Sequence, residues 1–293
     1  MLDQCVLALG FFDGVHLGHG ALLRRTRELA DELRLPAAAL TFDTHPLELV
    51  SGQRVALLNT AAERAALMRD LYGIDEVLIL HFDRETMAQP WQDFVRDTVC
   101  GEYRALHTVC GEDFRFGAGG RGTAALLKEE CAKLGVGCDC VAQVCMDGAP
   151  ISSTRIRQLL EAGETAAAVR LLGHPHLLTG TVTQGKKIGR TLGIPTANLT
   201  PAEGVLVPRF GVYAANAVFD GQTRRAVVNI GTRPTVGGEN VTVEPWILDF
   251  DGDLYGHTLR LELLDFLRPE KKFSSLDELK AEILRNAEVV RNM

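Results

Sequence analysis

Residues 6–20 read VLALGFFDGVHLGHG, a short apolar run followed by a loop rich in glycine and histidine. The run Val6–Leu9 has the length and apolar content of a buried strand, and the amphipathic pattern of Ala21–Leu33 predicts a helix soon after the loop. A strand that turns through glycines into a helix is typical of open α/β sheets, whose ligands lie at the carboxyl ends of the strands. The loop is therefore a candidate ligand site as well as the start of a fold.

The same alternation continues to about residue 145. Further apolar runs predict strands at Ala37–Phe42, Val77–Phe82, Leu106–Cys110 and Cys138–Val144, and amphipathic stretches predict helices at Ala61–Leu71, Trp91–Val99 and Ala124–Leu134. Alternating strands and helices predict a parallel sheet with helices on both faces. Two short helices are expected next, at Ser153–Glu161 and Glu164–Leu172.

The pattern changes after His176, where glycine and proline become frequent and short β-rich runs follow one another. These runs are Leu178–Thr183, Val212–Phe219, Arg225–Ile230, Val241–Phe250 and Thr258–Leu264, and a last amphipathic helix covers about Ser275 to Arg291. Short strands separated by turn residues predict a small antiparallel barrel or sandwich. The sequence thus predicts two domains, residues 1–175 and 176–293.

Composition and charge limit the classes of protein to consider. The chain has 293 residues, a net charge of -7 and a pI of about 5.7, which argues against a nucleic-acid binder with a basic face. No apolar run is long enough to span a membrane. An odd number of scattered cysteines indicates reduced thiols and a cytoplasmic location. They are expected to be small buried apolar residues, and a homo-oligomer is compatible with these properties.

Two histidines in the opening loop are candidates for phosphate chemistry. His16 and His19 stand three residues apart at the start of a helix, where free backbone N–H groups favour anions. Protonated, or donating only an N–H, they would stabilise charge on a transferred phosphoryl group. The alternatives are a capping or core pair, or a zinc site, for which no third ligand has a suitable spacing.

A second segment, residues 151–157, reads ISSTRIR and places hydroxyls before a helix that carries two arginines. Hydroxyls, first-turn amides and an arginine fork can all hold phosphate oxygens. The alternative is an ordinary serine cap with solvated arginines.

Together, GFFDGVHLGH and ISSTRIR resemble the signature pair of the nucleotidylyltransferase superfamily. The form resembles the FAD synthetase module of bacterial bifunctional riboflavin kinase/FAD synthetases. Between the pair, TFDTHP (residues 41–46) and GEDFRFG (residues 111–117) are similar to further motifs of that module in the same order. The resemblance implies a Rossmann-like domain that adenylylates FMN with ATP, giving FAD and pyrophosphate.

The same resemblance implies roles for individual residues. Those expected to bind ATP or its phosphates are Gly10, Phe11, Asp13 and Gly18, with His16 and His19 as catalytic contacts to the triphosphate. The leaving pyrophosphate is expected on Ser153, Thr154 and Arg157. Asp113 and Phe114 are expected to line the flavin and nucleotide site, although a loop carboxylate beside a core aromatic is the alternative.

The second half carries its own candidate site in GKKIGRTLGIPTAN, residues 185–198. Its glycines permit close approach of the backbone to a phosphate. Thr196 and Asn198 would share one face of an extended segment, as an oxygen pair suited to Mg²⁺. The alternative is a glycine-rich hairpin with solvated polar residues.

This string resembles the riboflavin kinase domain, whose Pro-Thr-Ala-Asn motif binds ATP and magnesium. The resemblance implies a Greek-key β-barrel with a terminal helix, ATP contacts from Gly185, Lys186, Gly189 and Arg190, and Mg²⁺ held by Thr196 and Asn198. It also implies that Glu244 is the general base toward riboflavin, although a solvent-facing strand carboxylate is the alternative. Trp246 replaces a histidine of the family pattern and Asn286 an aspartate, so these positions bear on the kinase step rather than on the fold.

The resulting hypothesis is an enzyme that phosphorylates riboflavin to FMN and then adenylylates FMN to FAD, with ATP as co-substrate and Mg²⁺ as cofactor. Three alternatives are kept. They are an FAD synthetase with an inactive kinase domain, a nucleotidylyltransferase for another small phosphate, and a flavin-binding module without catalysis.

Overall fold

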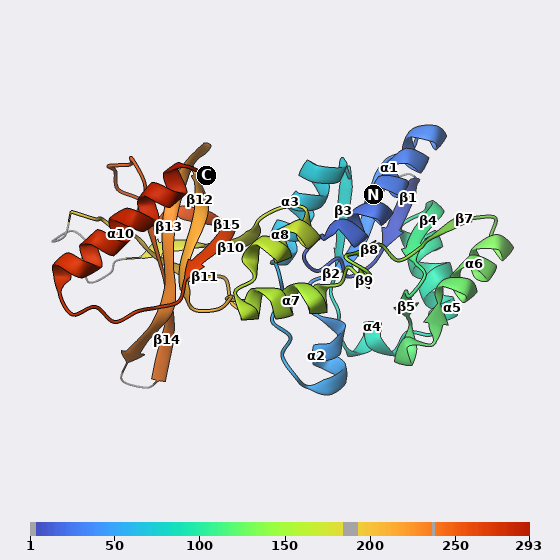
Figure 1. The fold of residues 1–293 in the computed structure, drawn as a ribbon. Helices are drawn as coiled ribbons and strands as arrows, with labels where there is room; N and C mark the ends of the chain where they lie inside the picture. Colours follow the sequence, from blue (N-terminus) through green and yellow to red (C-terminus); the bar gives the residue numbers. More distant parts are fainter. Residues whose placement is uncertain (1–3, 184–192, 236–237) are drawn as a thin grey trace. The chain divides into compact units, whose positions relative to one another are not determined.

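The structure is a computed structural model that describes residues 4–183, 193–235 and 238–293 (Figure 1). By internal contacts the chain divides into two compact units, Met1–Ser153 and Thr154–Met293. The helices that follow residue 153 thus group with the C-terminal unit, whereas the sequence pattern assigns them to the first domain. The boundary between residues 175 and 176 stays a prediction.

The first unit contains a main sheet, two short strand pairs and a set of helices. The main strands are β1 (Cys5–Leu9), β2 (Ala37–Phe42), β3 (Glu76–Leu80), β4 (Ala105–Gly111) and β7 (Gly137–Val141), and the short pairs are β5 (Arg115–Phe116) with β6 (Gly122–Thr123) and β8 (Cys145–Met146) with β9 (Ala149–Pro150). The helices are α1 (Leu17–Leu33), α2 (Pro46–Ser51), α3 (Ala61–Tyr72), α4 (Arg84–Ala88), α5 (Trp91–Asp93), the π-helical η1 (Phe94–Glu102), the 3₁₀ turn η2 (Ala118–Gly120) and α6 (Ala124–Lys133).

The main sheet is parallel in the order β3-β2-β1-β4-β7, which confirms the predicted α/β class. Every residue of the central strand β1 is buried. Val6 and Ala8 pack into one core cluster with apolar residues of α1 and α3, while Leu7 and Leu9 pack into another with residues of η1 and α6. A strand covered on both faces must be apolar at every position, and this explains the continuous run that opens the sequence.

The strand order also positions the candidate site. The chain runs outward from β1 through β2 to β3, and then returns to β4 on the other side of β1. The strand order therefore reverses between β1 and β4, and ligands of open α/β sheets bind at the carboxyl ends of strands at such a point. The loops after β1 and β4 are the two that carry predicted site residues.

The second unit is a closed antiparallel barrel in the order β10-β11-β14-β13-β12-β15, which confirms the predicted barrel with a terminal helix. Its strands are β10 (His176–Thr183), β11 (Asn198–Pro201), β12 (Gly211–Phe219), β13 (Gln222–Thr235), β14 (Gly238–Ile247) and β15 (Thr258–Arg268). Its helices are α7 (Ser153–Ala162), which begins at the last residue of the first unit, α8 (Thr165–Leu172) and α10 (Leu276–Arg291).

The barrel strands alternate between an inner and an outer core. On β12, Tyr213 and Ala215 point into the barrel core, while Val212 and Ala214 pack outward with Ala287 and Val290 of α10. Figure 1 shows α10 in red alongside the barrel strands. The terminal helix therefore closes the outer face of β12 and β13, which would otherwise expose apolar residues.

Element boundaries differ from the predictions for local reasons. Helix α1 begins at Leu17 rather than Ala21, because the His16 side chain accepts a hydrogen bond from the first turn and caps the helix. Strand β14 ends at Ile247 rather than Phe250, because the chain turns at Asp249 with a φ of 55°. The short strand β11 was not predicted, since it starts inside a segment dominated by glycine and proline signals.

Replacing Gly117 by alanine should destabilise the first unit more than replacing Gly119. Both glycines have positive φ values, 68° and 64°, so each alanine costs about 1–2 kcal/mol in backbone strain. Only at position 117 would the new Cβ also collide, at 2.5 Å from the Trp91 backbone, which adds about 1–3 kcal/mol. Urea unfolding of the two variants measures the difference, and equal losses of stability would contradict this account of the loop.

Candidate active sites

The loop after β1 has an unusual backbone. Phe12 and Val15 have φ values of 57° and 41°, although both carry side chains, and Gly14 has a φ of 82°. A positive φ at a β-branched residue is a genuine outlier that costs on the order of 1–3 kcal/mol and persists only where surrounding contacts enforce it. Phe12 and Val15 are both buried in the core, which supplies those contacts. Strain of this kind is typical of functional sites.

Hydrogen bonds from distant segments fix the same loop. The Asp13 carboxylate accepts from the backbone N–H of Leu58 at 2.9 Å, and the Asn59 side chain accepts from the N–H of Gly14 at 3.3 Å. The Ser153 hydroxyl donates to the Asp13 carbonyl at 2.8 Å. The contact joins the two motifs that the sequence paired, 140 positions apart. Asp13, predicted as a phosphate contact, holds the loop in this structure.

The two histidines form a stacked pair at the start of α1. His16 Nδ1 accepts from the backbone N–H of His19 at 3.2 Å, and the ring centroids are 3.6 Å apart. At Gly18, an added Cβ would lie 3.0 Å from the His16 ring, so glycine leaves room for the stack. Among the described residues, no third metal-binding side chain joins the pair.

His19 is a neutral imidazole with unused hydrogen-bonding capacity. Burial, then the proximity of His16 and of the Arg64 charge, lowers the pKa of His19 well below its usual value. Its Nδ1 atom is buried and has no partner among the residues described. The structure therefore favours a histidine that offers a hydrogen bond to a bound group over one that carries a positive charge.

Arg64 on α3 is a functional candidate that sequence reasoning missed. It is 0% exposed, and its Nη1 donates to the carbonyls of Phe11 and Phe42 at 2.8 and 3.0 Å and to the Thr41 hydroxyl at 2.8 Å. Its guanidinium carbon lies 4.3 Å from the centroid of the Phe11 ring. Burial lowers the pKa of Arg64 to about 10, so it remains a cation at neutral pH.

Two donors of this arginine are left for a ligand. Its Nε and Nη2 are buried and have no hydrogen-bond partner in the described part of the chain. Burying a cation is costly, and the nearby Asp13 charge offsets part of that cost by raising the pKa of Arg64. A guanidinium also suits a phosphate group. Arg64 lies four residues before the buried Met68, on the apolar face of α3. A charged residue on an apolar helix face is the sequence signal that could have identified it.

The loop after β4 carries the predicted flavin and nucleotide residues. Asp113 is exposed, and Phe114 stacks on Phe116 with ring centroids 5.2 Å apart. Because β1 and β4 are paired, this loop starts at the same edge of the sheet as the histidine loop. The topology thus brings Asp113 and Phe114 to the edge where the histidines lie.

The remaining predicted residues of the first motif pair lie on α7. Ser153 begins the helix, and Thr154 and Arg157 follow one turn apart, so their side chains share a helix face. Thr154 is exposed and Arg157 is half-buried. Both belong to the second unit by contacts, and their roles as pyrophosphate ligands remain predictions.

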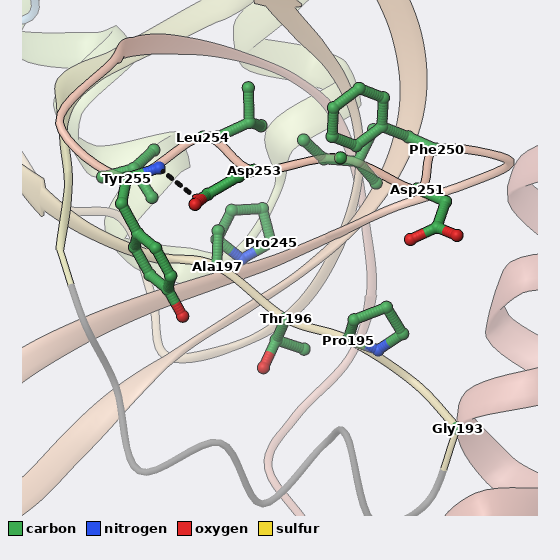
Figure 2. Close-up of a pocket in the computed structure, with 13 residues that line it drawn as sticks. Gly193, Pro195, Thr196, Ala197, Pro245, Phe250, Asp251, Asp253, Leu254 and Tyr255 are labelled. Carbon is green, nitrogen blue, oxygen red and sulfur yellow. Dashed lines mark hydrogen bonds between the residues drawn. The ribbon is translucent and has the colours of Figure 1, made fainter.

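The barrel contains a cavity of about 480 Å³ that belongs to the second candidate site (Figure 2). Its wall includes Thr196 and Ala197 from the predicted motif, Pro245 and Ile247 of β14, and the loop of residues 250–255. Ala197 is anchored there, since its N–H donates to the Pro245 carbonyl at 2.9 Å. Of the predicted ATP contacts, Gly185, Lys186, Gly189 and Arg190 lie outside the described residues.

The two predicted magnesium ligands occupy different settings. Thr196 lines the cavity, and Figure 2 shows its hydroxyl and that of Tyr255 directed to the same side. Asn198 is the first residue of β11, paired with Thr183 of β10, and its carbonyl accepts from the Thr183 hydroxyl at 3.3 Å. The sequence analysis gave no site role to the loop that supplies Tyr255 and Asp253.

Glu244 lies on the other face of β14. Val243 and Ile247 belong to the barrel core, so Glu244 and Trp246 point outward by strand alternation. Glu244 is half-buried and pairs across the strands with Asn229 of β13. The predicted base thus lies on the opposite face of β14 from the cavity, which its neighbour Pro245 lines together with Ile247.

The two departures from the kinase pattern pack near α10. Trp246 contacts the cluster formed by barrel residues with Ala287 and Val290 of that helix. Asn286 is 7% exposed, and its Nδ2 is a buried donor without a partner among the described residues. The Trp246 side chain therefore helps to seat the terminal helix, on which Asn286 is buried.

Known proteins resemble the chain along its whole length. The FAD synthetase family matches residues 1–155 and the riboflavin kinase family matches residues 172–293. Proteins named "Bifunctional riboflavin kinase/FMN adenylyltransferase" are 40% identical in Escherichia coli K12, covering 97% of this chain and 91% of the relative, and 35% identical in Haemophilus influenzae, covering 99% and 94%. The Bacillus subtilis protein of that name is 32% identical, covering 96% and 89%.

A solved structure agrees with the fold of the whole chain. A crystal structure of a macrolide-efflux protein from Streptococcus pneumoniae has a TM-score of 0.91 and 31% identity, covering 100% of this chain and 96% of that one. In the present chain, none of the described helices has the length and apolar character needed to cross a bilayer.

Arg64→Met should lower the rate of adenylylation of FMN by roughly 100–1000-fold, as expected when one preorganised donor to a developing charge is removed. The exposed Arg69 on the same helix provides the control, since Arg69→Met should leave the rate unchanged. Chromatographic assay of FAD from supplied FMN and ATP measures both. Unchanged FAD formation by a folded Arg64→Met variant would rule out the assigned role.

Proposed function

We propose which residues of this chain, which belongs to the family of bifunctional riboflavin kinases/FMN adenylyltransferases, carry out each of the two reactions. The enzyme phosphorylates riboflavin with ATP to give FMN and then adenylylates FMN to FAD with release of pyrophosphate. Our proposal assigns the second reaction to the loops after β1 and β4, and the first to the rim of the barrel around β14.

Adenylylation joins an oxygen of the FMN phosphate to the α-phosphorus of ATP and breaks the bond to pyrophosphate. No protein nucleophile is needed, so the enzyme acts by positioning and by stabilising charge. We assign to neutral His19 a hydrogen bond to the triphosphate and to His16 the role of orienting it. The observation that carries this assignment is the set of buried polar atoms without partners among the described residues, His19 Nδ1 and Arg64 Nε and Nη2, beside a strained loop.

Other residues complete the proposed adenylylation site. Ser153, Thr154 and Arg157 would hold the departing pyrophosphate, because hydroxyls and a guanidinium at a helix start suit phosphate oxygens. Gly10, Phe11 and Gly18 would let the nucleotide approach the backbone of the loop. Asp113 and Phe114 would line the flavin side, where a half-buried aromatic ring offers a surface for stacking.

In the barrel, we propose that Glu244 accepts the proton of the riboflavin 5′-hydroxyl while that oxygen attacks the γ-phosphorus of ATP. Support comes from its half-buried position on β14, next to Pro245, which lines the cavity.

Mg²⁺ fits the donors of the barrel site. The Thr196 hydroxyl and the Asn198 amide are oxygen ligands of the kind that this ion prefers, and they would hold it beside the phosphates of ATP. When bound, the ion neutralises phosphate charge. A cytoplasmic location is supported by cysteines that are all unpaired thiols.

His19→Ala should lower FAD formation from FMN by roughly 100–1000-fold, because a donor to the reacting phosphates is lost. FMN formation from riboflavin should stay unchanged, since its site lies in the other unit. His81→Ala, an exposed histidine of the same unit, is the control for general effects. Separate assays of the two products test this, and an equal loss of both activities in a folded variant would contradict it.

Glu244→Gln should have the reverse effect. Loss of a general base lowers the rate of riboflavin phosphorylation by roughly 100–10,000-fold, while FAD formation from supplied FMN persists. Glu288→Gln, at an exposed position of α10, should behave like the unmodified enzyme. Normal phosphorylation by Glu244→Gln would remove Glu244 as the base.

A further inference from the structure

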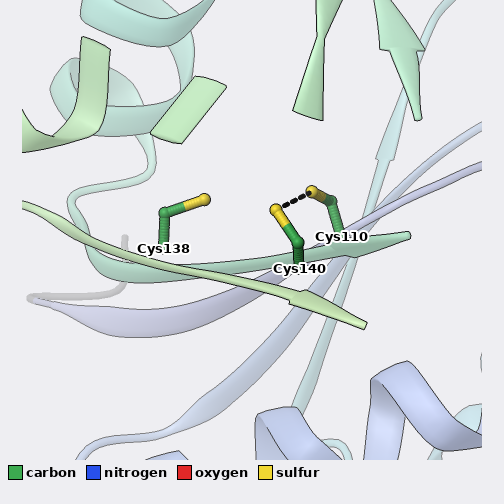
Figure 3. Close-up of side chains that lie close together, drawn as sticks. All are labelled: Cys110, Cys138 and Cys140. Carbon is green, nitrogen blue, oxygen red and sulfur yellow. Dashed lines mark hydrogen bonds between the residues drawn. The ribbon is translucent and has the colours of Figure 1, made fainter. Parts of the chain in front are cut away.

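Three cysteines of the first unit converge on one face of the main sheet, although they are spread along the sequence. Cys110 ends the apolar part of β4, and Cys138 and Cys140 lie two residues apart on β7. Cys110 and Cys140 are paired across the parallel strands, and their sulfur atoms are 3.9 Å apart. Figure 3 shows the Cys138 sulfur directed toward the other two from the same side of the sheet.

The spacing of these sulfur atoms suits a single metal ion. All three lie within 4.8 Å of one another. Thiolates bound to tetrahedral Zn²⁺ at about 2.3 Å stand about 3.8 Å apart, so the observed triangle needs only small side-chain rotations to close. Sulfur ligands select soft and borderline metals over Mg²⁺, which keeps this site distinct from the magnesium chemistry of the enzyme.

We propose that Cys110, Cys138 and Cys140 bind one Zn²⁺ ion as thiolates, with water in the fourth position on the side where Cys140 is exposed. Three S–H groups lose their protons to solvent as three S–Zn bonds form, and no electron is transferred. Three thiolates with Zn²⁺ leave one net negative charge, whereas Cu⁺ would leave two in the same partly buried place. The smaller residual charge favours zinc.

Neighbouring side chains would orient these ligands. The Thr108 hydroxyl lies 3.7 Å from the sulfur of Cys131, and both side chains interact with the thiol of Cys138. Lys128 faces Cys140 with a favourable charge, while Asp113 faces Cys110 with an unfavourable one. Hydrogen-bonded partners around metal ligands typically fix ligand orientation and affinity.

The proposal predicts the direction of a pH effect. Cysteine binds zinc as the thiolate, so zinc must displace the protons of the three thiols. Affinity should accordingly rise with pH and fall in acid.

A place in the mechanism follows from the position of the cluster. Cys110 directly precedes Gly111, where the loop that carries Asp113 and Phe114 begins. A metal that joins the carboxyl ends of β4 and β7 would hold the start of that loop. Zinc would then act by positioning the flavin side of the adenylylation site, a consequence that rests on the proposed function.

The first experiment measures zinc binding directly. Reduced, chelator-treated full-length enzyme is titrated with Zn²⁺ against a chromogenic chelator, and we expect one equivalent per chain with proton release. Cys110→Ser and Cys138→Ser should each weaken zinc binding by more than roughly 100-fold. Loss of a residue that only hydrogen-bonds to a metal ligand costs roughly 10–100-fold, and loss of the ligand itself should cost more. Cys145→Ser, an exposed cysteine on β8 outside the cluster, should bind zinc like the unmodified protein.

A second measurement uses the unmodified chain and so does not depend on the folding of a variant. Cys140 and Cys145 are both exposed, which makes them a matched pair for alkylation followed by mass spectrometry. Zn²⁺ should slow alkylation of Cys140 by roughly tenfold or more, because a metal-bound thiolate is withdrawn from reaction, and should leave Cys145 unaffected. Absence of stoichiometric binding, equal protection of both cysteines, undiminished binding by Cys138→Ser, or binding of Cu⁺ without Zn²⁺ would each overturn the proposal.

Discussion

Burial of β1 on both faces is the constraint on which the adenylylation unit depends. An apolar central strand fixes where α1, α3, η1 and α6 can pack, and it delivers the chain to the edge of the sheet where the strand order reverses. There the backbone enters strained conformations at Phe12 and Val15 that only a rigid core can hold. Beside this loop lie buried polar atoms of His19 and Arg64 that have no partner among the described residues and that a ligand could use.

In the barrel, the candidate site depends on a single strand. One strand, β14, lines a cavity with Pro245 and Ile247 on its inner side and carries the Glu244 carboxylate on its outer side. The terminal helix covers apolar residues of β12 and β13, and Trp246 adds to that contact. The tryptophan that departs from the kinase pattern thus has a packing role.

Much of this organisation could be predicted from the sequence, because periodicity and turn residues act locally. The parallel sheet, the barrel, the histidine loop and its partner segment at Ser153 all followed from patterns or from a resemblance. Arg64 and the cysteine cluster did not, since each depends on contacts between distant segments. Cys138 and Cys140 have no zinc-knuckle spacing, and only the pairing of β4 with β7 brings Cys110 to them.

The central claim is that two separate sites, one at the loops after β1 and β4 and the other at the barrel, act in sequence through FMN. The most direct measurement is a chromatographic time course with riboflavin, ATP and Mg²⁺ in which His19→Ala and Glu244→Gln enzymes are assayed separately and then mixed. The account predicts that neither variant alone makes appreciable FAD, whereas the mixture accumulates FMN first and FAD after it. A mixture that forms FMN but no FAD, although Glu244→Gln converts supplied FMN, would contradict two sites linked by released FMN.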